Sequence, residues 1–243
     1  MIRILVPYHL DEQQDGLEEV TQPEITVTAD LPDGDFWSRL VALSRATADQ
    51  VAQSSRPLVF SGCCLTSLGT LTGLQRAGFT PGVVWFDAHG DVHTPATSTS
   101  GYQGGMALRL LTGAYSHLAA EPLGLHAVPE ERITLVDARD LDPPEEEYLR
   151  TSAIRRATVS DVATALPEGD LYLHIDLDVV DPSDAPGVRF PVSDGPSITE
   201  VAKGVAAVVA TGRVVGVGLC CTWFPGRGSV QQISPLLEAL SPF

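Results

Sequence analysis

The sequence lacks the marks of a secreted, membrane-spanning or nucleic-acid-binding protein. No stretch approaches the ~20 consecutive apolar residues that cross a bilayer. The N-terminus, MIRILVPYHLDEQQ, has neither the basic start nor the long apolar segment of a secretory signal. Basic side chains are also scarce, since 15 Lys and Arg stand against 31 Asp and Glu, for a formal net charge of −16. This balance argues against nucleic acid and anionic membranes as partners.

Cysteine is scarce as well. The four cysteines form two adjacent pairs, Cys63-Cys64 and Cys220-Cys221. Four cysteines in this spacing are no disulfide framework for a chain of 243 residues. We therefore expect a cytoplasmic protein with reduced thiols.

Short apolar runs alternate with longer amphipathic stretches along the chain. The expected strands are Ile2–Pro7, Pro57–Ser61, Gly82–Phe86, Arg132–Asp137, Leu171–Ile175 and Val214–Cys220. The expected helices are Asp35–Gln53, Thr66–Arg76, Gly105–Leu111, Pro144–Thr151, Ser197–Ala210 and Ser229–Ala239. Runs rich in Val, Ile and Leu suit strands that are covered on both faces. The alternation predicts one domain over residues 1–243, an α/β protein with a three-layer α/β/α sandwich and a mostly parallel central sheet.

Potential metal ligands follow two of the expected strands. Gly82–Phe86 leads into Asp87-Ala88-His89-Gly90-Asp91, and Leu171–Ile175 leads into Asp176-Leu177-Asp178. Residues two apart on an extended chain point the same way, so the side chains within each motif can converge. Ligands bind beyond the carboxyl ends of parallel strands. Carboxylates with an imidazole suit a divalent ion such as manganese, whereas turn and capping aspartates are the alternative reading.

The two motifs, DAHGD and DLDVVDP, resemble the metal-binding signatures of the arginase/ureohydrolase superfamily. The resemblance extends roughly from Pro57 to Pro225 and implies a hydrolase of guanidino C–N bonds with two manganese ions. It assigns five metal ligands, with the first Asp of each motif bridging the two ions. These ligands are Asp87, His89, Asp91, Asp176 and Asp178. Two such ions supply a nucleophilic water near neutral pH.

The same resemblance implies residues that bind an amino-acid substrate. Arg139-Asp140-Leu141-Asp142-Pro143 resembles the stretch that binds the α-amino group, with Asp142 at the binding position and Glu145 near it. Thr99-Ser100-Gly101 resembles the loop that contacts the α-carboxylate, with Ser100 as the donor. Asp142 is equally interpretable as a helix N-cap, because Pro is favoured at the first helical position. The two roles can coexist.

Three positions depart from the arginase pattern. Cys64 stands where arginases place a histidine ligand, and either ligates the metal as a thiolate or is a buried apolar residue. Gly104 stands at the proton-shuttling histidine, which leaves His93 as a candidate for proton transfer or carboxylate binding. Thr222, or Cys221 in the alternative alignment, replaces the glutamate that pairs with the guanidinium.

These departures oppose arginine and favour a less basic guanidine. Arginine's guanidinium is always charged, so losing its carboxylate partner leaves a costly cation. Nω-hydroxy-L-arginine is less basic, and its hydrolysis gives hydroxyurea and L-ornithine. The combination resembles the branch of the family that makes hydroxyurea for antibiotic biosynthesis. We take Asp91 and His93 as catalytic candidates and Ser100, Asp142, Glu145 and Thr222 as substrate-binding candidates.

Other interpretations remain. The chain could be another ureohydrolase, such as an arginase or a guanidino-acid hydrolase. It could also be a catalytically silent relative that binds a metabolite or partner, although decay should erode the five Asp and His positions too. A one-zinc deacetylase-like hydrolase would leave Asp91 and Asp178 superfluous. We expect a monomer, because the chain ends at Phe243 without the extended tail used in some arginase trimers.

Overall fold

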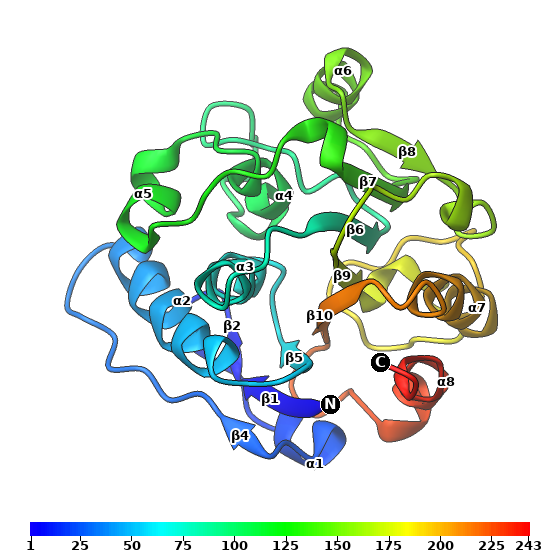
Figure 1. Ribbon diagram of the computed structural model, residues 1–243, viewed down its shortest axis with the longest axis horizontal. Helices are drawn as coiled ribbons and strands as arrows, with labels where there is room; N and C mark the ends of the chain where they lie inside the picture. The colour runs from blue at the N-terminus through cyan, green and yellow to red at the C-terminus, as the bar shows by residue number, and fades with distance from the viewer.

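The computed structural model describes residues 1–243, which form a central parallel sheet with helices on both faces (Figure 1). The sheet has eight strands in the order β4-β1-β5-β10-β9-β6-β7-β8, and every neighbouring pair is parallel. The strands are β1 (Ile2–Val6), β4 (Ile25–Thr26), β5 (Pro57–Ser61), β6 (Gly82–Asp87), β7 (Ile133–Asp137), β8 (Arg155–Ala157), β9 (Leu171–Asp176) and β10 (Val214–Cys220). The predicted three-layer α/β/α fold is confirmed.

The helices divide between the two faces of the sheet. On one face lie α2 (Phe36–Ala52), α3 (Thr66–Arg76), α4 (Ala107–Leu111) and α5 (Ala120–Leu123), and on the other α1 (Leu17–Thr21), α7 (Ile198–Val209) and α8 (Val230–Leu240). The helix α6 (Pro143–Thr151) follows β7 near the β8 edge (Figure 1). Buried side chains form one cluster of 34 residues on the first face and one of 30 on the second. The central strands are therefore apolar on both sides, as their composition predicts.

Most expected elements lie where the sequence places them. The bounds of β5, β10 and α3 agree with the expected ranges. Ser197 caps α7, since its hydroxyl accepts from the Glu200 N–H at 3.3 Å while the Glu200 carboxylate accepts from the Ser197 N–H at 2.8 Å. The expected helix at Gly105 differs, because a 3-10 turn over Gly104–Met106 precedes α4.

The shortest strands of the structure were not predicted from the sequence. The edge strands β4 and β8 have two and three residues, and the hairpin of β2 (Tyr8–His9) and β3 (Glu12–Gln13) has two residues in each strand. Runs this short carry no periodicity. None of the helices is long and apolar enough to cross a membrane.

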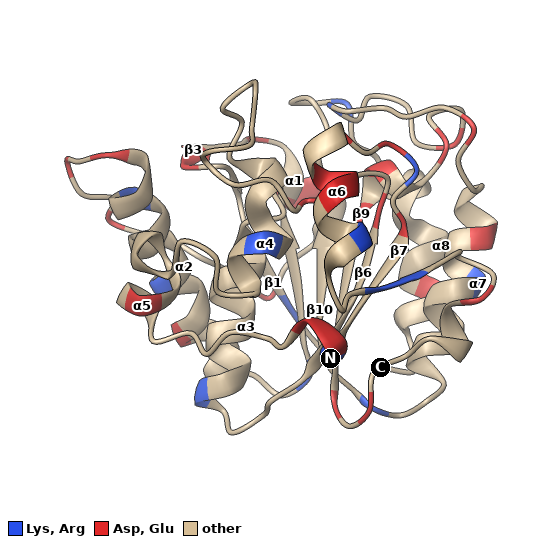
Figure 2. Ribbon diagram, turned by 90° about the horizontal axis from the view of Figure 1, so that it is seen from above, with Lys and Arg blue, Asp and Glu red and all other residues tan.

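The carboxyl ends of the strands lie together along one edge of the sheet, and several acidic residues gather on the loops there (Figure 2). The segment from Asp181 to Pro196 covers part of this edge. Arg139 holds it, since its guanidinium donates to the Val192 carbonyl within the segment at 2.7 Å and to the Val179 carbonyl just before it at 3.0 Å. The Arg139 side chain therefore supports the loop rather than lining the cavity beneath it.

Candidate metal centre and substrate cavity

A cavity of about 390 Å³ opens at the carboxyl edge of the sheet, between loops that follow five different strands. The adjacent strands β6 and β9 end in aspartates, and the segments that follow them supply the other Asp and His candidates. The loop after β5 supplies a thiol. Six predicted ligands thus line one cavity: Cys64, Asp87, His89, Asp91, Asp176 and Asp178.

His89 lies between two carboxylates. Its Nδ1 is 3.4 Å from Asp87 Oδ1 and 3.2 Å from Asp178 Oδ2. Burial works against a charged imidazole, but hydrogen bonds to Asp178 and Asp87 outweigh it and raise the pKa of His89 to about 12. The ligand atoms of these three residues all lie within 4.8 Å of one another, a spacing that fits a single divalent ion.

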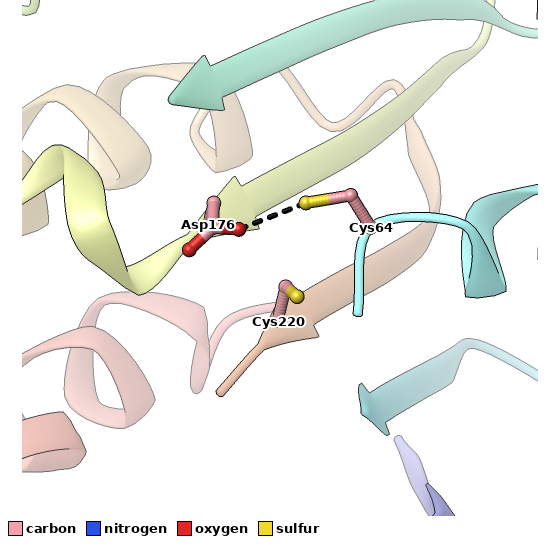
Figure 3. A group of neighbouring side chains, drawn as sticks. All are labelled: Cys64, Asp176 and Cys220. Atoms are coloured by element: carbon pink, nitrogen blue, oxygen red, sulfur yellow. Dashed lines mark hydrogen bonds between the residues drawn. The ribbon is translucent and has the colours of Figure 1, made fainter. Parts of the chain in front are cut away.

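Cys64 also lines the cavity, and its side chain points toward Asp176 (Figure 3). Its Sγ is 2.8 Å from Asp176 Oδ2 and 3.9 Å from Asp87 Oδ2. Cys220, at the end of β10, lies below this contact, and its sulfur is within 4.8 Å of both the Cys64 sulfur and an Asp176 oxygen. Burial raises the pKa of the Cys64 thiol well above its usual range. The thiol therefore keeps its proton and donates a hydrogen bond to Asp176.

The buried carboxylates at the floor of the cavity outnumber the positively charged groups beside them. Burial and the charges of Asp87 and Asp176 raise the pKa of Asp91 well above its usual range. Burial together with the charges of Asp176 and Asp87 does the same for Asp178. Asp91 Oδ2 is buried and has no hydrogen-bond partner at all. A buried, unpartnered carboxylate beside others like it is costly unless a cation neutralises it, so this donor set fits divalent metal ions.

Thr222 and Cys221 are the two candidates for the position where arginases carry a guanidinium-binding glutamate, and they face different sides of the sheet. Thr222 lines the cavity and donates from Oγ1 to Asp176 Oδ1 at 2.9 Å. Cys221 is fully buried in the cluster on the opposite face of the sheet. Of the two residues, Thr222 is therefore the one that faces the cavity.

The α-amino candidates lie at the rim of the cavity. Asp142 is the N-cap residue of α6, and its Oδ2 is 3.0 Å from His93 Nε2. Glu145 is buried and accepts from the Asp142 N–H at 3.1 Å and from the Val92 N–H at 3.2 Å. Asp142 thus has both of the arrangements that the sequence allows, helix cap and cavity residue. Glu145 ties the loop after β6 to α6.

Ser100 lines the same cavity from an exposed loop. Its Oγ accepts from the Tyr102 N–H at 3.2 Å. The structure therefore brings Ser100, Asp142 and His93 to the lining of one cavity.

Two aromatic groups at the site carry no sequence signal. Under the metal candidates, the rings of His174 and Trp85 stack with centroids 3.6 Å apart, and Trp85 Nε1 donates to Asp87 Oδ2 at 3.1 Å. His174 Nε2 is buried without a partner, and burial lowers the pKa of this imidazole to about 3. Over the cavity, Tyr102 and Phe190 pack with ring centroids 4.9 Å apart. Trp85 and His174 share a face because β6 and β9 pair in register, which only the sheet order reveals.

Comparisons with known proteins show that the chain is similar to arginases. The model of the arginase family matches residues 7–222. The arginase of Bacillus caldovelox is 37% identical over 167 residues, which cover 62% of this chain and 56% of that protein. The N(omega)-hydroxy-L-arginine amidinohydrolase of Streptomyces lavendulae is 29% identical over 210 residues, which cover 84% of this chain and 74% of that protein. The match thus spans little more than half the length of the Bacillus caldovelox relative.

Solved structures resemble the fold over almost the whole chain. The arginase of Bacillus subtilis superposes with a TM-score of 0.80 at 24% identity, covering 99% of this chain and 96% of the other. The formimidoylglutamase of the same species superposes with a TM-score of 0.74 at 16% identity, covering 99% and 86%. At these identities the likeness establishes the fold and not the substrate.

Proposed function

The chain belongs to the arginase family, and on that premise we propose that it is a metal-dependent amidinohydrolase acting on Nω-hydroxy-L-arginine. Water cleaves the guanidino C–N bond, giving hydroxyurea and L-ornithine. The observation that carries the proposal is the convergence of four aspartates, one imidazole and one thiol on a single cavity, with Asp91 buried and unpartnered. Burying four carboxylates together is costly unless cations neutralise them.

Six side chains would hold two divalent ions, for which we propose manganese because most of the donors are carboxylate oxygens and imidazole. The ligand atoms of His89, Asp87 and Asp178 lie together, and the Cys64 sulfur lies against Asp176. Asp91 would add its unpartnered oxygen, and Asp87 and Asp176 would be shared between the two ions. When bound, the pair of ions supplies a nucleophilic water at neutral pH.

The rim residues would hold the amino-acid end of the substrate. Asp142 carries the negative charge that suits an α-ammonium group, and the Ser100 hydroxyl suits an α-carboxylate. His93 is bonded to Asp142 and so orients that carboxylate toward the cavity. These contacts favour an intact amino acid over decarboxylated guanidines such as agmatine.

The floor favours a weakly basic guanidine. In place of a glutamate, the segment after β10 presents the Thr222 hydroxyl, which is already engaged by Asp176. A charged guanidinium would therefore find no carboxylate of its own at this position. Hydroxylation lowers the basicity of the guanidine and removes much of this cost.

A substrate panel tests the proposal. The manganese-loaded protein should release hydroxyurea from Nω-hydroxy-L-arginine faster than urea from arginine, agmatine or guanidinobutyrate. Asp178→Ala should lose metal and nearly all activity, whereas Asp161→Ala, at an exposed turn, should keep both. Protein that binds no metal and hydrolyses none of these compounds would instead be a silent binding relative.

We also propose that residues 1–243 act as one catalytic unit in a monomer. The six donors come from loops after strands at the middle of one sheet, so no second chain is needed to complete the cluster. Size-exclusion chromatography with light scattering checks the assembly, and a trimer would contradict the monomer.

A further inference from the structure

The ring of Tyr102 fills the space that a side chain at position 104 would occupy. A β-carbon built on Gly104 would lie 2.4 Å from Tyr102 Cε1 and Cζ and 2.5 Å from its hydroxyl oxygen. Real β-carbons essentially never come within 3.0 Å of another heavy atom in this way. Gly104 and Tyr102 are therefore a matched pair, in which the missing side chain at one position makes room for the ring of the other.

The Tyr102 hydroxyl forms a hydrogen bond with His9, which belongs to the β2–β3 hairpin. Tyr102 Oη lies 3.4 Å from His9 Nε2, and His9 Nδ1 lies 2.7 Å from the Gly62 carbonyl oxygen. A carbonyl only accepts, so Nδ1 carries the hydrogen. Burial lowers the pKa of His9 and keeps the ring neutral. Nε2 is then an acceptor, and the Tyr102 O–H donates to it.

This orientation fixes what Tyr102 can offer to a ligand. With its hydrogen directed at His9, the hydroxyl has only lone pairs left to offer, and Tyr102 is one of the residues that line the cavity. The Phe190 ring packs against the Tyr102 ring with centroids 4.9 Å apart, and the His9 ring lies at 6.1 Å with its plane 19° from that of Tyr102. These contacts and the hydrogen bond to His9 position the ring, and its oxygen is a neutral hydrogen-bond acceptor.

We propose that Tyr102 is a specificity-determining residue whose oxygen accepts a hydrogen bond from the N-hydroxyl of the substrate, with His9 as its positioning residue. The inference rests on the proposed function and explains its selectivity. A neutral acceptor satisfies a buried hydroxyl but does not neutralise a guanidinium cation. With Gly104 in place of a larger side chain, the Tyr102 ring occupies this part of the cavity and presents an oxygen that suits the hydroxylated guanidine.

Tyr102→Phe tests the acceptor, because it keeps the ring and removes the oxygen. We expect the ratio of kcat/KM for Nω-hydroxy-L-arginine to that for arginine to fall about tenfold, the size of one neutral hydrogen bond. The loss should appear mainly in KM for hydroxyarginine, with the arginine parameters unchanged. Tyr115→Phe is the matched control, because Tyr115 is 38% exposed and lies outside the cavity.

A stability cycle tests the matched pair without relying on turnover. Gly104→Ala should lower Tm in the parent chain and leave it unchanged in a Tyr102→Ala background, where the space is free. An equal drop of Tm in both backgrounds would contradict the claim that the side chains at positions 102 and 104 compete for the same space.

The outcomes separate the two proposals. An active parent whose Tyr102→Phe variant keeps the parent's substrate ratio overturns the role of Tyr102 and leaves the proposed function standing. A parent that does not hydrolyse hydroxyarginine overturns the proposed function and this inference with it.

Discussion

The hydroxyl of Thr222 donates to Asp176 Oδ1 at 2.9 Å, so the segment after β10 supports a candidate metal ligand. Asp176 also receives the Cys64 thiol on its other oxygen at 2.8 Å. Groups that orient a metal ligand in this way commonly contribute 10–100-fold to metal affinity. The contact is a direct consequence of threonine at this position, because neither apolar residues nor the neighbouring Cys221 could make it.

Thr222→Val should therefore weaken manganese binding by about tenfold, because it keeps the shape and removes the hydrogen bond. Metal titration by isothermal calorimetry measures the change. Thr72→Val, which removes a buried hydroxyl bonded only to the Leu68 carbonyl of α3, should leave metal affinity unchanged. Equal affinities in the Thr222 variant and the parent would refute the role of the contact.

Asp91→Asn should raise the Tm of the metal-free protein at pH 7 and reduce the gain in Tm that manganese brings. Burial and the charges of Asp87 and Asp176 raise the pKa of Asp91, so its ionised form destabilises the metal-free fold. The neutral amide removes this repulsion but is a poorer ligand. Thermal unfolding with and without manganese measures both effects, and a metal-free variant less stable than the parent would contradict the account.

Asp142→Ala should raise KM for the amino-acid substrate about tenfold and leave kcat nearly unchanged. Its carboxylate faces the cavity rim beside His93, where it would bind the substrate equally in the ground and transition states. Glu146→Ala, on the exposed side of α6, is the matched control. A fall in kcat with KM constant would instead assign Asp142 to the chemical step.

Cys64→His should strengthen manganese binding and raise arginine turnover, though not to arginase levels, because Gly104 and Thr222 remain. A thiolate donates more charge than imidazole and lessens the ion's Lewis acidity. Cys221→Ala, on the other face of the sheet, should change neither property. Weaker manganese binding in the histidine variant would show that Cys64 is the better ligand in this site.

The main frame of the fold was predictable because its signals are local. The bounds of β5 and β10 follow from apolar runs bounded by polar residues, and α3 follows from its periodicity. The edge strands β4 and β8 were missed because two or three residues carry no pattern.

The floor of the site was predictable for the same reason. The candidate ligands at Asp87 and Asp176 stand at the ends of buried strands, where parallel pairing brings them together. The roles of Tyr102 and His9 were not predictable, because their contact joins residues 93 positions apart. The choice of Thr222 over Cys221 also needed the structure, since adjacent residues of a strand end point to opposite faces.

An internal competition assay tests the central claim most directly. Equal concentrations of Nω-hydroxy-L-arginine and L-arginine are given together to the manganese-loaded protein, and hydroxyurea and urea are quantified at low conversion. Their ratio equals the ratio of the two kcat/KM values. The account predicts hydroxyurea in at least about tenfold excess over urea, the factor that a difference of ~1.4 kcal/mol in transition-state binding gives. Equal amounts of the two products, or an excess of urea, would contradict it.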